Sequence, residues 1–374
     1  MLLLACGSPP VAPDGVLLVT IDTLRADHLD PVHTPETWAL AEQGLRFEDA
    51  WSPIGLTTAA HASLLTGLTP PRHGLRGNNH HGYSLAAAHR TVAEVFQDAG
   101  WETGAFVSAW PAGPAGGLDQ GWAVFSGPAE GERGGGVAVT EARAWIGERR
   151  GPWLAWVHVY EPHGPYTPPA ADLAAVGGSD TDRDRYGGEV HAADRLLGPL
   201  YRDARRSGAG ILVTSDHGEI LDEERCGWQH ERSVGPGVLR VPLIVAGPKV
   251  PVGTRDERVG LMDLFPTLLR LGGLPDPGGH DGRDLLATPT PDRGVWVGEA
   301  GLCDPACAQG CSPAGFAGKD RIVHGPTSTW LDRPGRSPRG DPALASHLAA
   351  WPRAAAPQGD AHSEQGQALG YTDP

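Results

Sequence analysis

The chain has 374 residues, enough for one large α/β domain with a small appendage or for two domains. Its hydrophobic content of 40% supports a substantial core, and its net charge of −15 argues against nucleic acid or an anionic membrane surface as the main partner. The sequence contains no apolar run of about 18 residues, so no transmembrane helix is expected.

The N-terminus carries a short lipoprotein-like motif. Residues 3–6 read LLAC, which is typical of a bacterial lipobox, and residues 8–13 form a Pro-rich segment that suits a tether. Cys6 would then carry a lipid anchor, with residues 1–14 as signal remnant and tether. The charged segment and longer apolar run of a signal peptide are absent, so either the start codon lies upstream or the match is chance. We expect an exported protein on the periplasmic side of the cell envelope.

The remaining cysteines are interpreted as structural. A C-x3-C-x3-C spacing is not a standard zinc pattern, and an even set in an exported protein favours two disulfides. Their pairing stays open. The four residues are Cys226, Cys303, Cys307 and Cys311.

Strand and helix patterns alternate over the first 271 residues. Residues 16–21 form a continuous apolar run typical of a buried parallel strand. Further strands are predicted at 103–108, 153–159, 210–214 and 241–246, and helices at 35–43, 57–65, 91–99, 139–148, 189–206 and 262–271. The alternation predicts an α/β fold with a mostly parallel, doubly wound sheet flanked by helices.

This regularity fades after residue 272. We expect a main domain over residues 15–290 and a small C-terminal antiparallel subdomain over 291–331, with strands at 295–299, 320–323 and 327–330. Residues 332–374 are rich in Pro, Arg, Ala and Gly, which predicts a poorly ordered low-complexity tail.

Polar residues gather directly behind the predicted strands. Asp22, Glu161, His163, Asp216 and His217 each follow one of them. In open parallel sheets, ligand sites collect at the carboxyl ends of strands. The sequence therefore predicts that these side chains share one site.

Residues 57–67 read TTAAHASLLTG. This segment resembles the nucleophile motif of the sulfatase branch of the alkaline phosphatase superfamily, C/S-x-P-S-R-x-x-L-x-T-G. Leu64, Thr66 and Gly67 match, but Thr57 stands where a sulfatase carries Cys or Ser. Together with Asp22 upstream and the SDHG run at 215–218, the resemblance extends over about residues 16–290.

The resemblance implies a chemistry that depends on Thr57. Oxidation of a threonine gives a ketone, so Thr57 cannot become the formylglycine of sulfatases. Threonine-bearing relatives instead attack phosphorus and form a phospho-threonine intermediate. The implied function is a metal-dependent hydrolase or transferase of phosphate esters. Alternatives are a sulfatase working without formylglycine, an inactive surface binding protein on the same scaffold, or Thr57 acting only as a helix N-cap.

The resemblance also implies a metal centre. Asp22, the Thr57 oxygen, Asp216 and His217 would hold a divalent ion, with Glu161 as a further candidate. Three oxygen ligands and one nitrogen suit Zn²⁺ or Mn²⁺ better than Ca²⁺. One or two ions are expected.

Three further histidines are candidates for handling protons and substrate oxygens. His61 replaces the Arg of the sulfatase motif and could orient Thr57 or accept its proton. His163 and His230 fall where the family contacts the substrate, so they either contact the phosphate and protonate the leaving group or bind a second ion. The expected substrate is a phosphate or sulfate ester.

Overall fold

The computed structural model describes residues 15–221, 230 and 235–289, together with the backbone of four short strands at 296–298, 314–317, 320–324 and 329–332. Cys6 with its tether, the tail from 333 onward, and Cys226, Cys303, Cys307 and Cys311 lie outside the described residues. The lipid anchor and the disulfides therefore stay predictions. None of the helices in the described ranges combines the length and hydrophobicity needed to cross a bilayer.

The core of the molecule is an eight-stranded sheet. The strands lie in the order β4 (Val124–Ser126), β3 (Glu102–Phe106), β5 (Trp153–Val159), β1 (Gly15–Ile21), β6 (Gly210–Thr214), β7 (Arg240–Ala246), β2 (Leu45–Trp51) and β8 (Gly253–Gly260). Neighbouring strands pair in parallel except where β7 meets β6 and β2, since β7 runs in the opposite direction. The predicted mostly parallel sheet is confirmed.

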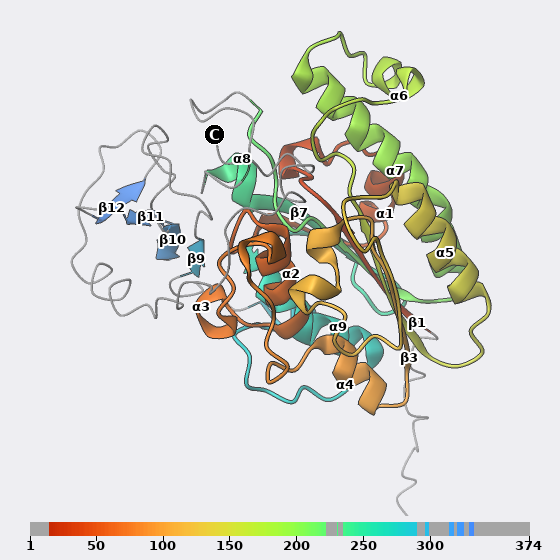
Figure 1. Ribbon diagram of the computed structural model, residues 1–374, viewed down its shortest axis with the longest axis vertical. Helices are drawn as coiled ribbons and strands as arrows, with labels where there is room; N and C mark the ends of the chain where they lie inside the picture. The colour runs from red at the N-terminus through yellow and green to blue at the C-terminus, as the bar shows by residue number, and fades with distance from the viewer. Residues whose placement is uncertain are drawn as a thin grey trace, which may run out of the picture.

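Helices cover both faces of this sheet (Figure 1). One face carries α2 (Thr57–Thr66), α4 (Val92–Asp98) and α9 (Leu264–Gly272), and the other carries α1 (Pro35–Ala41), α5 (Gly135–Gly147) and α7 (Asp182–Arg206). Successive side chains of β1 point to opposite faces of the sheet. Val16 and Leu18 pack in the core under α2, α4 and α9, and Leu17 and Val19 pack in the core under α1, α5 and α7. Because β1 is central and buried on both sides, it is apolar throughout.

Shorter elements complete the main domain, namely α3 (Pro70–His73), α6 (Ala170–Ala175) and α8 (Pro236–Leu239). A separate four-stranded antiparallel sheet has the order β12 (Thr329–Asp332), β11 (Asp320–His324), β10 (Ala314–Ala317), β9 (Trp296–Gly298). Its antiparallel pairing agrees with the predicted C-terminal subdomain, although β10 was not anticipated. The exact domain boundaries stay predictions.

The loop after β1 is fixed by a tyrosine of α7. The Tyr186 hydroxyl is fully buried, donates to the Thr23 carbonyl at 2.8 Å and accepts from the Arg25 amide at 3.0 Å. This loop starts at Asp22, so the anchor also holds one of the predicted ligands in place.

We expect Tyr186→Phe to lower the free energy of unfolding by about 1–3 kcal/mol, because it leaves two buried backbone groups unpaired. Tyr201→Phe is the matched control, because Tyr201 lies on the same helix and its hydroxyl, within the described part of the chain, bonds only to the Thr37 hydroxyl, at 3.2 Å. Urea unfolding of both variants measures the difference. A loss no larger in Tyr186→Phe than in Tyr201→Phe would contradict the anchoring role.

Candidate active site

The carboxyl ends of β1 and β6 are joined by one serine. The Ser215 hydroxyl donates to the Ile21 carbonyl at 2.6 Å and accepts from the Leu24 amide at 3.0 Å. This contact places Asp22, immediately after β1, beside Asp216, which follows Ser215. The structure thus brings together Asp22, Asp216 and His217 of the five residues that were predicted to share a site.

Asp22, Asp216 and His217 form a fully buried cluster. His217 Nε2 lies 3.8 Å from Asp22 Oδ1 and 3.5 Å from Asp216 Oδ2. His217 Nδ1 is 2.9 Å from the Gly218 carbonyl, which can only accept, so Nδ1 carries the proton and Nε2 presents a lone pair to the cluster. Among the described residues, both Asp22 oxygens, Asp216 Oδ2 and His217 Nε2 have no hydrogen-bond partner.

The buried carboxylates of this cluster would be stabilised by a bound cation. Burial, and then the charge of Asp216, raise the pKa of Asp22 well above its ordinary value. Burial also opposes ionisation of Asp216, but His217, His61 and His158 outweigh it and lower the pKa of Asp216. Unpaired buried carboxylates are costly. The two carboxylates and the imidazole nitrogen therefore fit a divalent ion, with Zn²⁺ and Mn²⁺ suited to the mixed donors.

Thr57 is the first residue of α2 and does not cap it. The N-cap is Leu56, and the amide of Thr58 is capped instead by Asn78 Oδ1 at 2.8 Å. The Thr57 hydroxyl is fully buried and has no hydrogen-bond partner among the described residues. The reading of Thr57 as a simple N-cap is therefore wrong, and its hydroxyl stays available at a helix N-terminus that favours negative charge.

His61 belongs to a hydrogen-bond chain that links the sheet to α2. Its Nδ1 lies 2.8 Å from the Thr57 carbonyl, so Nδ1 carries the proton. Its Nε2 therefore accepts from the Thr20 hydroxyl at 3.0 Å, and that hydroxyl accepts in turn from Trp156 Nε1 at 3.0 Å. Burial lowers the pKa of His61 to about 4. Both nitrogens are engaged, so the structure favours orientation of Thr57 over acceptance of its proton.

His163 and His230 reach the cluster through ring contacts. The His230 ring stacks on His217 with centroids 4.3 Å apart, and His163 meets His230 edge-on at 5.1 Å. His163 Nδ1 donates to the Gly164 carbonyl at 2.8 Å, whereas His230 Nδ1 lies 3.4 Å from the buried Glu219 carboxylate. Burial lowers the pKa of His163 to about 3 and that of His230 to about 4.

Glu161 is directed elsewhere. Its carboxylate accepts the Gly135 amide at 3.0 and 3.2 Å and so caps the first turn of α5. A Cβ added at Gly135 would lie 2.5 Å from Glu161 Oε2, so the glycine permits this close approach. The structure does not bring Glu161 into either of the candidate metal groups found among the described residues.

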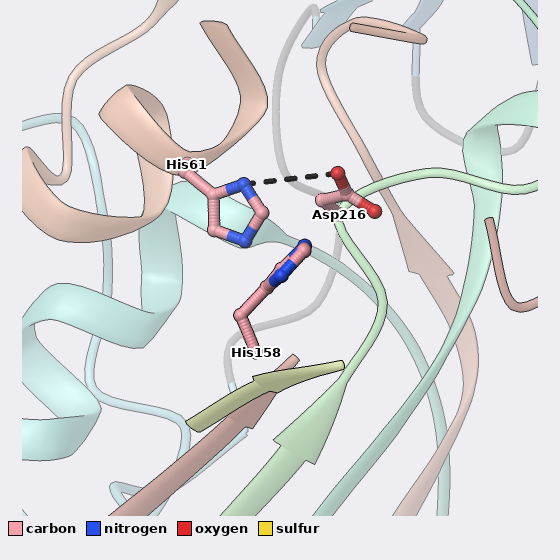
Figure 2. Close-up of side chains that lie close together, drawn as sticks. All are labelled: His61, His158 and Asp216. Carbon is pink, nitrogen blue, oxygen red and sulfur yellow. Dashed lines mark ion pairs between the residues drawn. The ribbon is translucent and has the colours of Figure 1, made fainter. Parts of the chain in front are cut away.

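Sequence reasoning missed His158 and Glu219. His158 lies on β5 with its Nε2 3.3 Å from Asp22 Oδ2, and Figure 2 shows its ring beside His61 and Asp216. The available signal was a histidine inside a strand that is otherwise apolar. Glu219 follows the SDHG run, and burial raises the pKa of its carboxyl. An acidic residue one place beyond a candidate ligand pair was the signal there.

Comparison with known proteins identifies the family. The Sulfatase family model matches residues 15–129 and 135–274, more than half of the chain. The chain belongs to the sulfatase family. The motif at residues 57–67 predicted this family.

Individual relatives carry different activities. The 2,3-bisphosphoglycerate-independent phosphoglycerate mutase of Cereibacter sphaeroides is 35% identical over 125 residues, covering 31% of this chain and 24% of the relative. Arylsulfatase K of Danio rerio is 38% identical over 100 residues, covering 26% and 18%. The chain therefore spans about a quarter or less of these curated relatives. The phosphonate monoester hydrolase of Silicibacter pomeroyi shares the fold, with a TM-score of 0.69, 21% identity and coverage of 90% and 93%.

We predict that Asp22→Asn stabilises the cation-free chain near pH 7. A carboxyl whose pKa is raised by folding makes folding less favourable as pH rises from its unfolded pKa through its folded pKa, and the amide removes that cost. The same change should abolish stabilisation by zinc or manganese, which amounts to about 2.7 kcal/mol at 100 times Kd. Thermal unfolding with chelator and with added metal tests both effects. A variant less stable than wild type without metal, yet still stabilised by it, would contradict the assignment.

Proposed function

We propose that the chain is a metal-dependent phosphoester hydrolase or phosphotransferase in which Thr57 is the nucleophile. The observation that carries the proposal is the position of the Thr57 hydroxyl. It is buried, performs no capping, and lies at the start of the helix whose motif the sulfatase family uses for its nucleophile.

The side chain of Thr57 favours phosphorus over sulfur as the electrophile. Its methyl group bars conversion to the aldehyde that expels sulfate, whereas a hydroxyl can attack phosphorus directly. The Thr57 oxygen would form a bond to phosphorus as the ester alcohol departs, and a water or second alcohol would then release the phosphoryl group and regenerate the hydroxyl.

Asp22, Asp216 and His217 would hold the ion, with the Thr57 oxygen as a further ligand. Zn²⁺ or Mn²⁺ suits this donor set best, and Ca²⁺ remains the weaker alternative. When bound, the ion supplies Lewis acidity that lowers the pKa of a coordinated hydroxyl and stabilises charge on the phosphoryl oxygens.

The histidines divide the remaining work. His61 holds the Thr57 carbonyl and so fixes the first turn of α2. His163 donates its Nδ1 proton to Gly164, which leaves a lone pair on Nε2. Neutral rings of this kind can take the proton released by Thr57 and pass it to the departing alkoxide. We assign that transfer to His230, beside His217. We assign substrate-oxygen contacts to His163, which would donate from Nε2 once that nitrogen is protonated.

Hydrolysis of a sulfate ester without formylglycine is the second candidate. It is favoured by the Sulfatase family match and by the similarity to arylsulfatase K. An inactive binding protein on this scaffold is disfavoured, since Asp22, Thr57, Asp216 and His217 are all in place. Attachment to the cell envelope through Cys6 is a further proposal that rests on the lipobox alone.

Three substrates separate the candidate functions. We expect turnover of p-nitrophenyl phosphate or of bis-p-nitrophenyl phosphate to exceed that of p-nitrophenyl sulfate with zinc or manganese present. Faster cleavage of the sulfate would favour the sulfatase alternative. Absence of bound metal and of all three activities would favour the binding protein.

We expect Thr57→Ala to lower kcat by roughly 10⁴-fold or more while the cation stays bound. Thr57→Ser keeps a hydroxyl and should retain much of the activity, so it is the matched control. Acid quenching during turnover, followed by mass spectrometry, should find phosphate on Thr57 in the wild type. Full activity of the alanine variant would exclude Thr57 as nucleophile.

His230→Gln should affect poor leaving groups most. Loss of proton transfer typically costs about 10²- to 10⁴-fold. We expect a loss of this size with an alkyl phosphate, and a much smaller one with p-nitrophenyl phosphate, whose leaving group needs no proton. Equal losses with both substrates would assign His230 to binding rather than to proton transfer.

A further inference from the structure

A buried histidine on β5 has no assigned role in the proposed reaction. His158 is fully buried, and its Nε2 lies 3.3 Å from Asp22 Oδ2. Because His158 lies this close to Asp22 and Asp216, it could play one of two roles. His158 either binds a second ion together with His61 and Asp216, which lie within ligand distance of one another, or it positions Asp22.

The hydrogen bonds of His158 determine its tautomer. The Ser108 amide points at His158 Nδ1 from 3.4 Å, and the Ser108 hydroxyl donates to the His158 carbonyl at 2.9 Å. Since an amide can only donate, Nδ1 is the acceptor and carries the lone pair. The ring proton is then on Nε2, which faces the Asp22 carboxylate.

The same reasoning removes His61 from a second metal site. Its Nδ1 proton is directed at the Thr57 carbonyl and its Nε2 accepts from Thr20, so neither nitrogen offers a lone pair. The ion pair drawn in Figure 2 joins His61 Nδ1 to Asp216 Oδ2 over 3.7 Å. Of the three residues in this group, only Asp216 remains able to bind an ion in the observed arrangement.

We propose that His158 is a positioning residue that fixes Asp22 for a single ion. Its Nε2–H faces Asp22 Oδ2 across 3.3 Å, which leaves Asp22 Oδ1 toward His217 and the cation. The residue after Asp22 is the neutral Thr23, so Asp22 has no adjacent carboxylate beside it to share the ion, and its orientation depends on His158. This inference rests on the metal-dependent function proposed above.

Two substitutions separate positioning from ligation. Glutamine keeps an N–H donor near the position of Nε2 but is a poor zinc ligand, whereas leucine removes the donor. We expect His158→Leu to bind zinc about 10- to 100-fold more weakly, as partners of metal ligands typically do, and His158→Gln to stay close to wild type. All three proteins should bind one zinc.

The measurements are calorimetric titration with zinc and metal analysis of the full chain. His73→Leu is the matched control, because His73 is equally buried but its nitrogens bond to Ser63 and the Leu75 amide. It should leave zinc affinity unchanged. Two ions in the wild type falling to one in both His158 variants would overturn the proposal in favour of a second metal site. Unchanged affinity in His158→Leu would overturn the positioning role.

A second measurement does not depend on a folded leucine variant. Long-range ¹H–¹⁵N spectra of wild type, assigned by the signal lost in His158→Gln, report the tautomer. We expect a protonated Nε2 with and without zinc, and a metal-bound Nε2 would overturn the proposal. Wild-type protein that binds no zinc would overturn it together with the metal-dependent function. An active, zinc-loaded enzyme with unchanged affinity in His158→Leu would overturn this inference alone.

Discussion

Two carboxylates buried side by side impose the main constraint on this structure. Asp22 and Asp216 follow adjacent strands and are fully shielded from water, and the charge of Asp216 adds to the cost of ionising Asp22. Such an arrangement persists only if positive charge is supplied or if the surroundings hold the pair rigidly. The serine between the strand ends and the tyrosine of α7 provide the rigidity, and the proposed divalent ion would provide the positive charge.

The second structural element of the site is the buried helix α2. All its residues are inaccessible, so its position is determined by packing between the sheet and α9 rather than by solvent. Asn78 caps its first turn from a distant loop, and His61 ties its first carbonyl to the sheet through Thr20. These contacts leave the Thr57 hydroxyl without a structural task. A group held this tightly loses little entropy when it reacts, which is the physical advantage of placing a nucleophile on a rigid element.

The sequence predicted much of this architecture, for identifiable reasons. β5 and β6 are continuous apolar runs, and both were predicted with their observed bounds. β2 was missed because Arg46, Glu48 and Asp49 interrupt its apolar positions. Residues behind strand ends were predicted to meet, and Asp22, Asp216 and His217 do so. Glu161 is an exception to that rule, because its carboxylate accepts a hydrogen bond from the Gly135 amide at the start of α5. His158 was missed because it lies inside β5, where side chains were expected only to pack in the hydrophobic core.

The reversed strand β7 determines which loops can form the substrate side of the centre. Parallel strands contribute the segments that follow them, but β7 runs against β6 and so contributes the segment that precedes it. The connection between Thr214 and Arg240 therefore leaves from and returns to the same edge of the sheet, and it includes His230. Its length can change without shifting the register of any strand. Under the function proposed above, changes in this connection beyond His217 would alter ester selectivity while Asp22, Asp216 and His217 keep their positions.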